Sequence, residues 1–252
     1  MRKFILTVLF IFFTLSVASC FRPENVRAAN NYRKCNPDEV ACQASVTVFI
    51  TPLNGRRHSG SGVVISSDGL ILTEAHVTGE VLEAAIEICS EEKAKLHCEP
   101  AYLVAFDYRL DLALIQVLRH FRVPAQLGSS AKLHWSSPLY VISTPEDTHK
   151  ILFHQTLTPV QFDQRGIFWE DYDTIIPKLR LKAVTAEIAP GSSGGGVFDA
   201  EGRLVGMIQR CDKNLDGTPD GRISYAIPVE VIRFFLQTTR GCTGAPNACM
   251  PQ

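Results

Sequence analysis

Short apolar runs separated by turn-forming residues dominate the chain from about Ser45 onward. Glycine, proline, asparagine and aspartate bound the runs, a pattern typical of an all-β sandwich or barrel. We expect a first set of strands at residues 46–52, 62–66, 70–73, 84–89, 102–105 and 112–117. A second set is expected at residues 139–143, 151–157, 181–186, 196–199, 204–209 and 223–227. Residues 120–135 lack strand periodicity, so the break between two β units should lie there.

One segment predicts a helix, at residues 228–238. It opens with Pro228 and the acidic Glu230, and its apolar side chains then form a broad surface that should pack on the second β unit. Residues 30–38 are expected to be an irregular lead-in. Residues 45–240 are thus assigned to one folded region, and residues 241–252 to a tail.

The net charge does not favour nucleic acid as a partner. The chain has 252 residues, and its 25 Lys and Arg nearly balance its 26 Asp and Glu. Neither sign forms a run or stripe that would follow a phosphate backbone. With 46% hydrophobic residues the chain is globular, and it is long enough to bury one large core or two small ones.

The N-terminus has the pattern of a signal peptide, which we assign to residues 1–19. Arg2 and Lys3 precede an apolar stretch, residues 4–17, that is too short to span a bilayer. The stretch ends in Val17-Ala18-Ser19-Cys20, which resembles a bacterial lipobox, so Cys20 would carry diacylglycerol and begin an anchor and linker segment, residues 20–44. The alternative is ordinary cleavage near Val26-Arg27-Ala28-Ala29. The protein is therefore expected in the bacterial cell envelope as a membrane-anchored lipoprotein, or else secreted.

Export makes disulfide bonds the expected state of the cysteines. Without Cys20, seven cysteines remain, and three pairs lie close in the sequence. The local pairs are Cys35 with Cys42, Cys89 with Cys98 and Cys242 with Cys249. Cys211 would be left over, although a bridge from Cys211 to the tail is the alternative. No cysteine or histidine cluster has the spacing of a zinc site.

A glycine-rich loop between two expected strands carries the strongest chemical signal. In Gly191-Ser192-Ser193-Gly194-Gly195, glycine permits a sharp turn that exposes a serine hydroxyl and aims the amides of Gly191 and Ser193 at one oxyanion. The alternative is a flexible linker. A linker would not normally be bounded by Ile188 on one side and the apolar 196–199 segment on the other, so we favour a nucleophile loop around Ser193.

Two further residues complete a catalytic set in sequence order. His76 follows the apolar strand 70–73 where that strand enters a turn, and Asp111 stands at the mouth of the strand 112–117. Alone, His76 would be taken for an ordinary histidine and Asp111 for a strand cap. Together with Ser193 they supply the nucleophile, the base and the orienting acid that acyl transfer from a peptide requires.

These motifs resemble the trypsin-like peptidase superfamily, and its bacterial HtrA/Deg-like branch most of all. The resemblance covers roughly residues 45–236 and rests on Ser59-Gly60-Ser61-Gly62-Val63-Val64-Ile65, Leu70-Ile71-Leu72-Thr73-Glu74-Ala75-His76-Val77, Asp107 with Asp111-Leu112-Ala113-Leu114, the Gly191–Gly195 loop and Tyr225-Ala226-Ile227-Pro228. It implies two perpendicular six-stranded β-barrels, with the triad His76, Asp111 and Ser193 in the cleft between them.

The sequence departs from this branch at a few places. HtrA-like proteins usually carry a PDZ domain after the Ala-Ile-Pro segment and its helix, and we expect none here. Ser192 stands where the branch commonly has Asn, and Gly196 where Pro or Ala is common. Neither position supplies a catalytic atom, so activity is still expected. Ser192 as the nucleophile is the minor alternative.

A second motif matches the first half of a calcium loop. Its oxygen-bearing residues alternate, and a glycine stands where the chain must turn sharply. The candidate ligands are Asp212, Asn214, Asp216, Thr218 and Asp220. Ile223 occupies the place of the usual bidentate Glu, and a polar hairpin loop explains the same residues. Catalysis itself requires no cofactor.

The sequence therefore predicts an exported serine endopeptidase that acts on proteins or peptides through an acyl-enzyme. The base of the specificity pocket is expected near Glu187 and Ile188, and no Asp suited to binding Arg or Lys is evident, which favours small or aliphatic substrate side chains. The alternative function is a silent or calcium-modulated binding or adhesion lipoprotein on the same fold. The sequence does not define an oligomeric state.

Overall fold

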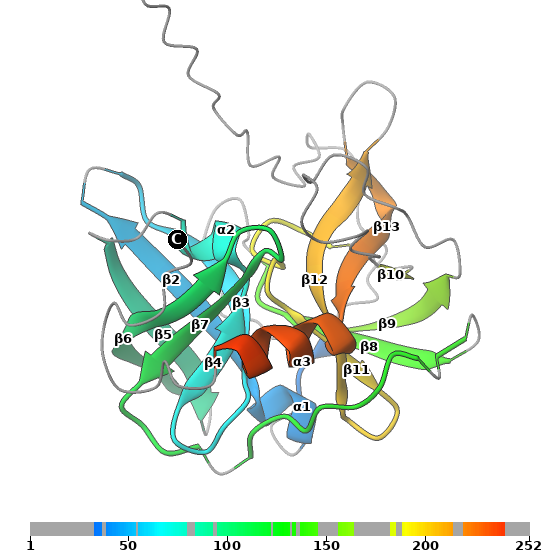
Figure 1. The fold of residues 1–252 in the computed structure, drawn as a ribbon, viewed down its shortest axis with the longest axis horizontal. Helices are drawn as coiled ribbons and strands as arrows, with labels where there is room; N and C mark the ends of the chain where they lie inside the picture. The colour runs from blue at the N-terminus through cyan, green and yellow to red at the C-terminus, as the bar shows by residue number, and fades with distance from the viewer. Residues whose placement is uncertain are drawn as a thin grey trace, which may run out of the picture.

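The described part of the chain forms two β units that lie side by side (Figure 1). The computed structural model describes residues 33–36, 39–53, 55–79, 84–92, 95–121, 123–131, 133–134, 137–145, 156–163, 182–184, 188–213 and 219–239. Each unit is built from one half of the sequence, apart from one short N-terminal strand that joins the second unit.

The first unit is a closed antiparallel barrel with the strand order β2-β3-β4-β7-β6-β5. Its strands are β2 (Ser45–Pro52), β3 (His58–Val64), β4 (Leu70–Thr73), β5 (Ala84–Glu92), β6 (Lys95–Asp107) and β7 (Leu112–Val117). Alternate residues of β2, namely Val46, Val48 and Ile50, pack with Ile71 and Ile115 in its interior. β-branched side chains suit this pleated surface, so the strand pattern of the sequence becomes the barrel core.

The second unit contains a seven-stranded sheet that returns on itself. Its strands are β1 (Arg33–Lys34), β8 (Pro138–Ser143), β9 (Thr156–Asp163), β10 (Lys182–Val184), β11 (Gly196–Asp199), β12 (Leu204–Lys213) and β13 (Pro219–Pro228). The order β9-β10-β13-β12-β11-β8 closes because β8 also pairs with β9. Strand β1 pairs with the start of β9 and β10 with its end, so β1 extends one edge of this second barrel.

Three helices accompany the barrels: α1 (Val40–Gln43), α2 (Ala75–Thr78) and α3 (Val229–Thr238). Helix α3 starts directly after Pro228, whose backbone is extended, and Glu230 lies in its first turn. Val229, Ile232 and Phe235 are buried at a helical spacing. The helix contacts β12 and β13, as expected from its apolar face.

One apolar cluster joins the two barrels. It contains Val63 and Leu72 of the first barrel, Phe198 and Met207 of the second, and Phe235 of α3. These side chains are at most 1% exposed. Close packing of this kind resists displacement, so the cluster holds the facing ends of the barrels in a fixed relation.

The observed strands differ from the expected ones mainly at their ends. Strand β3 begins at His58, before the expected 62–66 segment, because its polar start pairs with β2 in an antiparallel register. Strand β9 runs over Thr156–Asp163 and overlaps only the end of the expected 151–157 segment; residues 151–155 lie outside the described part. Part of the expected irregular lead-in, Arg33–Lys34, is a strand because it pairs with β9.

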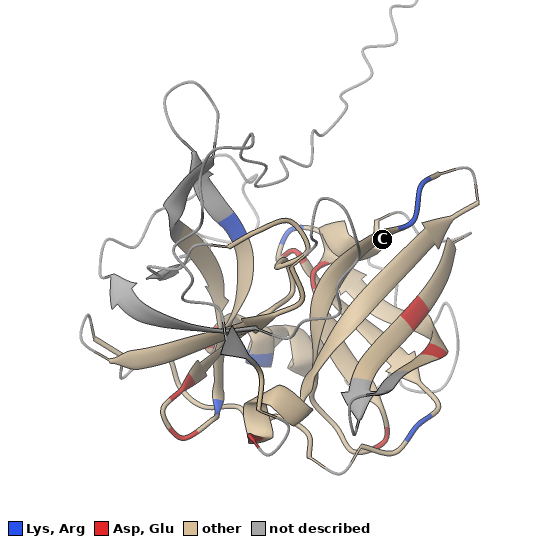
Figure 2. Cartoon of the chain, turned by 180° about the vertical axis from the view of Figure 1, so that it is seen from behind, with Lys and Arg blue, Asp and Glu red and all other residues tan. Residues whose placement is uncertain are grey.

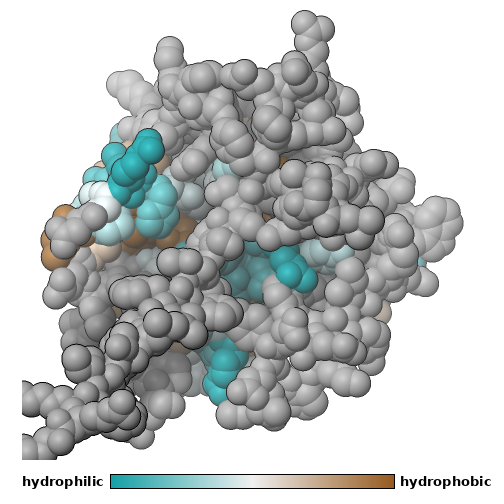
Figure 3. Space-filling view, turned by 90° about the horizontal axis from the view of Figure 1, so that it is seen from above, coloured by the Kyte–Doolittle hydropathy of each residue, from teal (hydrophilic) through white to brown (hydrophobic). Residues whose placement is uncertain are grey.

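Acidic, basic and exposed apolar side chains are all spread over the described surface. Figure 2 shows described acidic and basic positions on both barrels. At the left edge in Figure 3, hydrophobic and hydrophilic residues lie next to one another. Leu53, Leu118 and Phe234 are exposed at 71%, 87% and 54%, and they belong to three separate segments. Among the described residues, no helix has the length and apolarity needed to cross a membrane.

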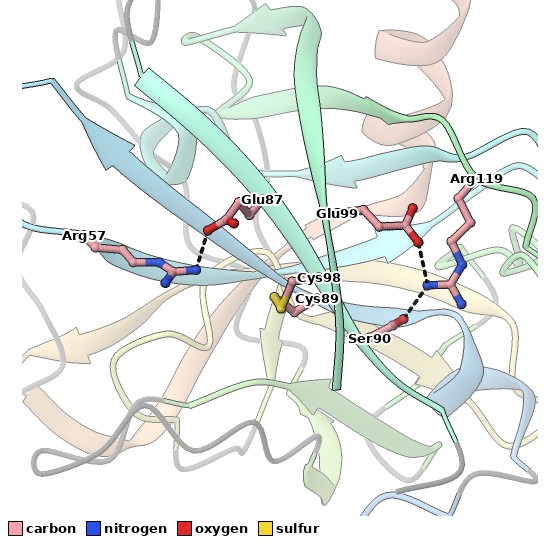
Figure 4. The surroundings of a disulfide bond; sticks show 7 residues. All are labelled: Arg57, Glu87, Cys89, Ser90, Cys98, Glu99 and Arg119. Carbon is pink, nitrogen blue, oxygen red and sulfur yellow. Dashed lines mark hydrogen bonds and ion pairs between the residues drawn. A yellow bond between two sulfur atoms is a disulfide. The ribbon is translucent and has the colours of Figure 1, made fainter. Parts of the chain in front are cut away.

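Two of the expected disulfide bonds are confirmed. Cys89–Cys98 links opposite positions of β5 and β6, with Arg57 and Glu87 paired on one side and Arg119 on the other (Figure 4). Cys35–Cys42 ties the segment after β1 to α1. The third expected pair, Cys242 with Cys249, and the lipidation residue Cys20 lie outside the described residues.

Candidate active site

His76 lies on the single-turn helix α2, directly after strand β4 of the first barrel. Figure 1 shows α2 at the end of this barrel, beside the second barrel. The His76 backbone N–H donates to Asp111 Oδ1 at 2.9 Å, and ring Nδ1 lies 2.8 Å from Asp111 Oδ2. A carboxylate on Nδ1 favours the tautomer whose Nε2 carries a lone pair, so His76 can act as a base.

Asp111 lies in the turn between β6 and β7, in a conformation that side chains rarely adopt. Its φ is 55°, the one positive value at a non-glycine residue in the described chain. Asp and Asn tolerate this region better than other residues. The strained turn directs both carboxylate oxygens at His76, and strain of this kind tends to occur at functional sites.

Gln209 of β12 connects the two barrels at this point. Its side-chain Nε2 donates to Asp111 Oδ2 at 3.0 Å. Its backbone carbonyl accepts a hydrogen bond from the Ser193 hydroxyl at 3.3 Å. One residue of the second barrel thus contacts the expected acid through its side chain and the expected nucleophile through its backbone. No local motif of the sequence marks Gln209 as a site residue.

Ser193 lies in a tight loop before β11, with left-handed glycines on both sides. Gly191 has a φ of 87° and Gly194 a φ of 83°, which only glycine adopts without strain. Gln209 contacts both Ser193 and Asp111, and Asp111 contacts His76, so the structure places all three expected residues in one site. Within the described contacts its hydroxyl is bonded to the Gln209 carbonyl and not to His76. Such bonds are often loose before substrate binds.

In the described part of the chain, the backbone amides of Gly191 and Ser193 have no hydrogen-bond acceptor. Neighbouring amides are used within the loop: Ser192 N–H donates to the Ala189 carbonyl and Gly194 N–H to the Ile208 carbonyl. Among the described backbone hydrogen bonds, neither Gly191 nor Ser193 is a donor. Two free N–H groups on one turn are the arrangement that stabilises a tetrahedral intermediate.

Ser61 of β3 binds the loop that carries Ser193 to the first barrel. Its N–H donates to the Ser193 carbonyl and its Oγ to the Gly191 carbonyl, both at 2.7 Å. Its own carbonyl accepts a hydrogen bond from Thr73 Oγ1, also at 2.7 Å. The Ser-Gly-Ser-Gly motif of the sequence is therefore the docking edge for the loop that carries Ser193.

Gly194 is packed so closely against this edge that a single methyl group should disrupt it. A Cβ at Gly194 would lie 2.1 Å from the Ser61 carbonyl oxygen, and its φ is left-handed. We expect Gly194→Ala to lower the free energy of unfolding by about 3 kcal/mol or more, and to abolish peptide hydrolysis. Chemical denaturation measures the first effect.

Gly202→Ala is the matched control, because Gly202 has a φ of 75° but nothing within 4 Å of a Cβ. It should cost only the left-handed strain, about 1 kcal/mol. Equal losses of stability in the two variants would contradict the packing argument.

Glu74 is a buried acid in the Leu70–Val77 motif, and the sequence alone predicts no role for it. Its side chain is fully buried, and its Oε2 lies 3.7 Å from His76 Nε2. Burial raises the pKa of Glu74 well above its usual range, and the charge of Asp111 raises it further. The nearby Gly194 amide and Ser193 side chain lower this pKa but do not offset burial. Neither donates a hydrogen bond of good geometry to the carboxyl group, since the Gly194 N–H donates to the Ile208 carbonyl and the Ser193 hydroxyl to the Gln209 carbonyl.

The expected calcium ligands cannot be assembled from the described residues. Asp212 and Asp220 lie on the strand backbones of β12 and β13, and their side chains are not described. Asn214, Asp216 and Thr218 lie outside the described residues. The calcium loop therefore stays a prediction.

Two barrels with an Asp–His pair and a glycine-bounded serine between them define the trypsin-like class. The family model of the trypsin-like peptidase domain matches residues 60–207, more than half of the chain. The chain belongs to this family. Serine proteases of this family generally need no cofactor.

Several HtrA-like proteins are similar to the chain. A probable periplasmic serine endoprotease, DegP-like, of Pseudomonas putida is 30% identical over 68% of this chain and 33% of its own length. Human serine protease HTRA4 is 28% identical over 71% of this chain and 34% of its own length. The chain thus spans about one third of the length of these curated relatives.

Solved structures agree with the fold. The HtrA-type protease AlgW with a tripeptide superposes with a TM-score of 0.63 at 25% identity, covering 78% of this chain and 60% of AlgW. The active form of the Rv3671c protease from M. tuberculosis superposes with a TM-score of 0.62 at 17% identity, covering 83% and 85%. At 17% identity the likeness to Rv3671c concerns the fold alone.

Proposed function

We propose that the chain is an exported serine endopeptidase with Ser193 as nucleophile, His76 as general base and Asp111 as orienting acid. One observation carries this proposal: Asp111 accepts hydrogen bonds from His76 and Gln209, and the Gln209 carbonyl accepts one from Ser193. The network spans both barrels and joins the groups that acyl transfer needs. Membership of the trypsin-like peptidase family supports the same activity.

The chemistry follows from these contacts. On substrate binding, the Ser193 hydroxyl turns from the Gln209 carbonyl toward His76 Nε2 and attacks the scissile carbonyl while His76 takes its proton. The amides of Gly191 and Ser193 hold the oxyanion, an interaction typically worth about 3 to 4 kcal/mol per donor. His76 then protonates the leaving amine, and water repeats the cycle on the acyl-enzyme. Every group in this scheme belongs to the chain.

The substrates we propose are proteins or peptides, cleaved after small or aliphatic side chains. AlgW was solved with a tripeptide, which supports a peptide ligand in this fold. Purified protein incubated with a random peptide library should generate new termini that mass spectrometry assigns to such side chains. Pretreatment with a fluorophosphonate should abolish cleavage, while a chelator should not.

Binding of peptides without any cleavage would favour the adhesion-type alternative and overturn the peptidase assignment. Cleavage that survives the fluorophosphonate would instead contradict a serine mechanism.

Export and lipid anchoring through Cys20 are part of the same proposal. The apolar stretch before Val17-Ala18-Ser19-Cys20 supports them, as do the two disulfide bonds, which are typical of oxidising compartments. Cells fed a labelled fatty acid should incorporate it into the wild-type protein and into Cys211→Ala, but not into Cys20→Ala. Equal labelling of all three would refute the anchor.

A further inference from the structure

The carboxyl group of Glu74 lacks the partners that a buried acid needs. It is 0% exposed, and neither Oε1 nor Oε2 has a hydrogen-bond partner in the described structure. Burying an unpaired carboxylate is costly, and unsatisfied buried polar groups are rare in folded proteins. The triad mechanism does not use Glu74, so its position beside His76 requires another explanation.

The distance between Glu74 and His76 suits a shared metal ion better than a direct contact. Glu74 Oε2 lies 3.7 Å from His76 Nε2, beyond hydrogen-bond range. Two ligand atoms at usual zinc distances on a tetrahedral ion stand about 3.4 Å apart. A shift of a few tenths of an ångström would therefore let both atoms bind one ion.

Asp111 completes the arrangement from the other side of the imidazole. It lies 2.8 Å from Nδ1, which leaves the Nε2 lone pair free for a metal. A carboxylate on the second ring nitrogen is the usual support of a metal-binding histidine. Glu74, His76 and Asp111 each offer one ligand atom, all within 4.8 Å of one another.

We propose that Glu74 and His76 form an inhibitory Zn²⁺ site, with Asp111 orienting the imidazole and water filling the remaining positions of the ion. An imidazole nitrogen with a carboxylate oxygen favours zinc over calcium or magnesium, which prefer oxygen ligands alone. The ion would enter from the side of His76, whose side chain is 29% exposed. As the ion binds, the carboxyl group of Glu74 releases its proton to solvent and gains the partner that it lacks.

Inhibition follows from the atom that the ion occupies, and this consequence rests on the proposed peptidase function. His76 Nε2 is the atom that accepts the Ser193 proton. A bound ion uses the same lone pair, so the base and the metal exclude one another. Removal of the ion restores the lone pair without breaking a covalent bond, so the inhibition is reversible.

Zinc binding can be measured without activity, by calorimetric titration of Zn²⁺ into the full chain carrying Ser193→Ala. We expect one ion per chain and a dissociation constant in the micromolar range. Adding Glu74→Gln, which keeps the shape but cannot lose a proton to become a carboxylate ligand, should weaken binding at least tenfold. Glu87→Gln, which removes a carboxylate that is paired with Arg57 elsewhere in the first barrel, should leave it unchanged. Equal affinity in the Glu74→Gln and Glu87→Gln proteins would overturn the site.

A second readout covers the case in which Glu74→Gln does not fold. In the nitrogen NMR spectrum of the Ser193→Ala protein, Zn²⁺ should shift the His76 Nε2 resonance, which is assigned by its loss in His76→Ala. An unshifted resonance at saturating Zn²⁺ would overturn the proposal.

The effect of Zn²⁺ on the rate of peptide hydrolysis is the third test. Zn²⁺ should inhibit wild-type peptide hydrolysis at the concentrations that saturate binding, and a chelator should restore the rate. Hydrolysis that persists with Zn²⁺ bound would overturn the inhibitory role. A protein that binds Zn²⁺ through Glu74 but never hydrolyses peptides would keep the site and refute the peptidase function instead.

Discussion

Replacing Ser193 by alanine should lower kcat/KM for peptide hydrolysis by about a million-fold, because the proposed acyl-enzyme forms on its hydroxyl. The change removes one hydroxyl whose hydrogen bond, to the Gln209 carbonyl, is long at 3.3 Å. The loop conformation depends instead on its glycines and on backbone bonds to Ser61, such as that from Ser61 N–H to the Ser193 carbonyl. The variant should therefore fold with nearly wild-type stability. Steady-state kinetics and thermal unfolding measure both quantities.

Ser192→Ala is the matched control, since Ser192 is the adjacent serine of the same loop. Its side chain is buried, and its Oγ accepts hydrogen bonds from Ser143 Oγ and the Ala189 amide at 3.1 and 3.3 Å. We expect a stability loss of about 1 kcal/mol per lost hydrogen bond and a rate within tenfold of wild type. If the Ser192→Ala protein did not hydrolyse peptides and the Ser193→Ala protein did, Ser192 would be the nucleophile.

Asp111→Asn should lower kcat by about ten-thousandfold while leaving the fold intact. Asparagine tolerates the left-handed backbone at φ 55° as well as aspartate does, so the turn is preserved. The amide can still accept from the His76 backbone but has no charge, and its NH₂ group can turn the ring to the wrong tautomer. Steady-state kinetics at saturating substrate report the loss in kcat.

Asp107→Asn tests whether this effect belongs to Asp111 alone. Asp107 lies at the end of β6 and accepts the Arg109 and Leu110 amides at 2.8 and 3.3 Å, contacts that an asparagine oxygen can keep. Its kcat should remain within a few-fold of wild type. A near-normal kcat in Asp111→Asn would refute the orienting role.

The local sequence pattern was sufficient to predict the ends of those strands that are bounded by turn-forming residues. Leu70–Thr73, Leu112–Val117 and Gly196–Asp199 are bounded by turns and were predicted with their observed limits. Strand β3 was predicted short because its first residues are polar or glycine and have low strand propensity; pairing with β2 overrides that preference. Helices α1 and α2 are single turns, which are too short to show a helical period.

The residues of the candidate site also fall into two groups, those that a local motif reveals and those that only long-range contacts reveal. His76, Asp111 and Ser193 stand in recognisable local motifs, so the sequence alone identifies them as candidates. Gln209 acts on Asp111 from a position 98 residues away, which no local pattern reveals. Glu74 also stands in a local motif, but its burial involves Gly194 and Ser193 of the second barrel, which no local pattern reveals. A charged residue at a strand end is usually exposed, so its sequence position predicts the opposite environment.

The most direct test of the central claim is to find the atom that a fluorophosphonate probe modifies. The probe reacts with a serine that an adjacent base activates, so peptide mapping by mass spectrometry should place one adduct on Ser193. Asp111→Asn should slow its formation, and Ser193→Ala should prevent it. No adduct on the folded wild-type protein, or an adduct on another residue, would contradict the assignment of Ser193 as the nucleophile.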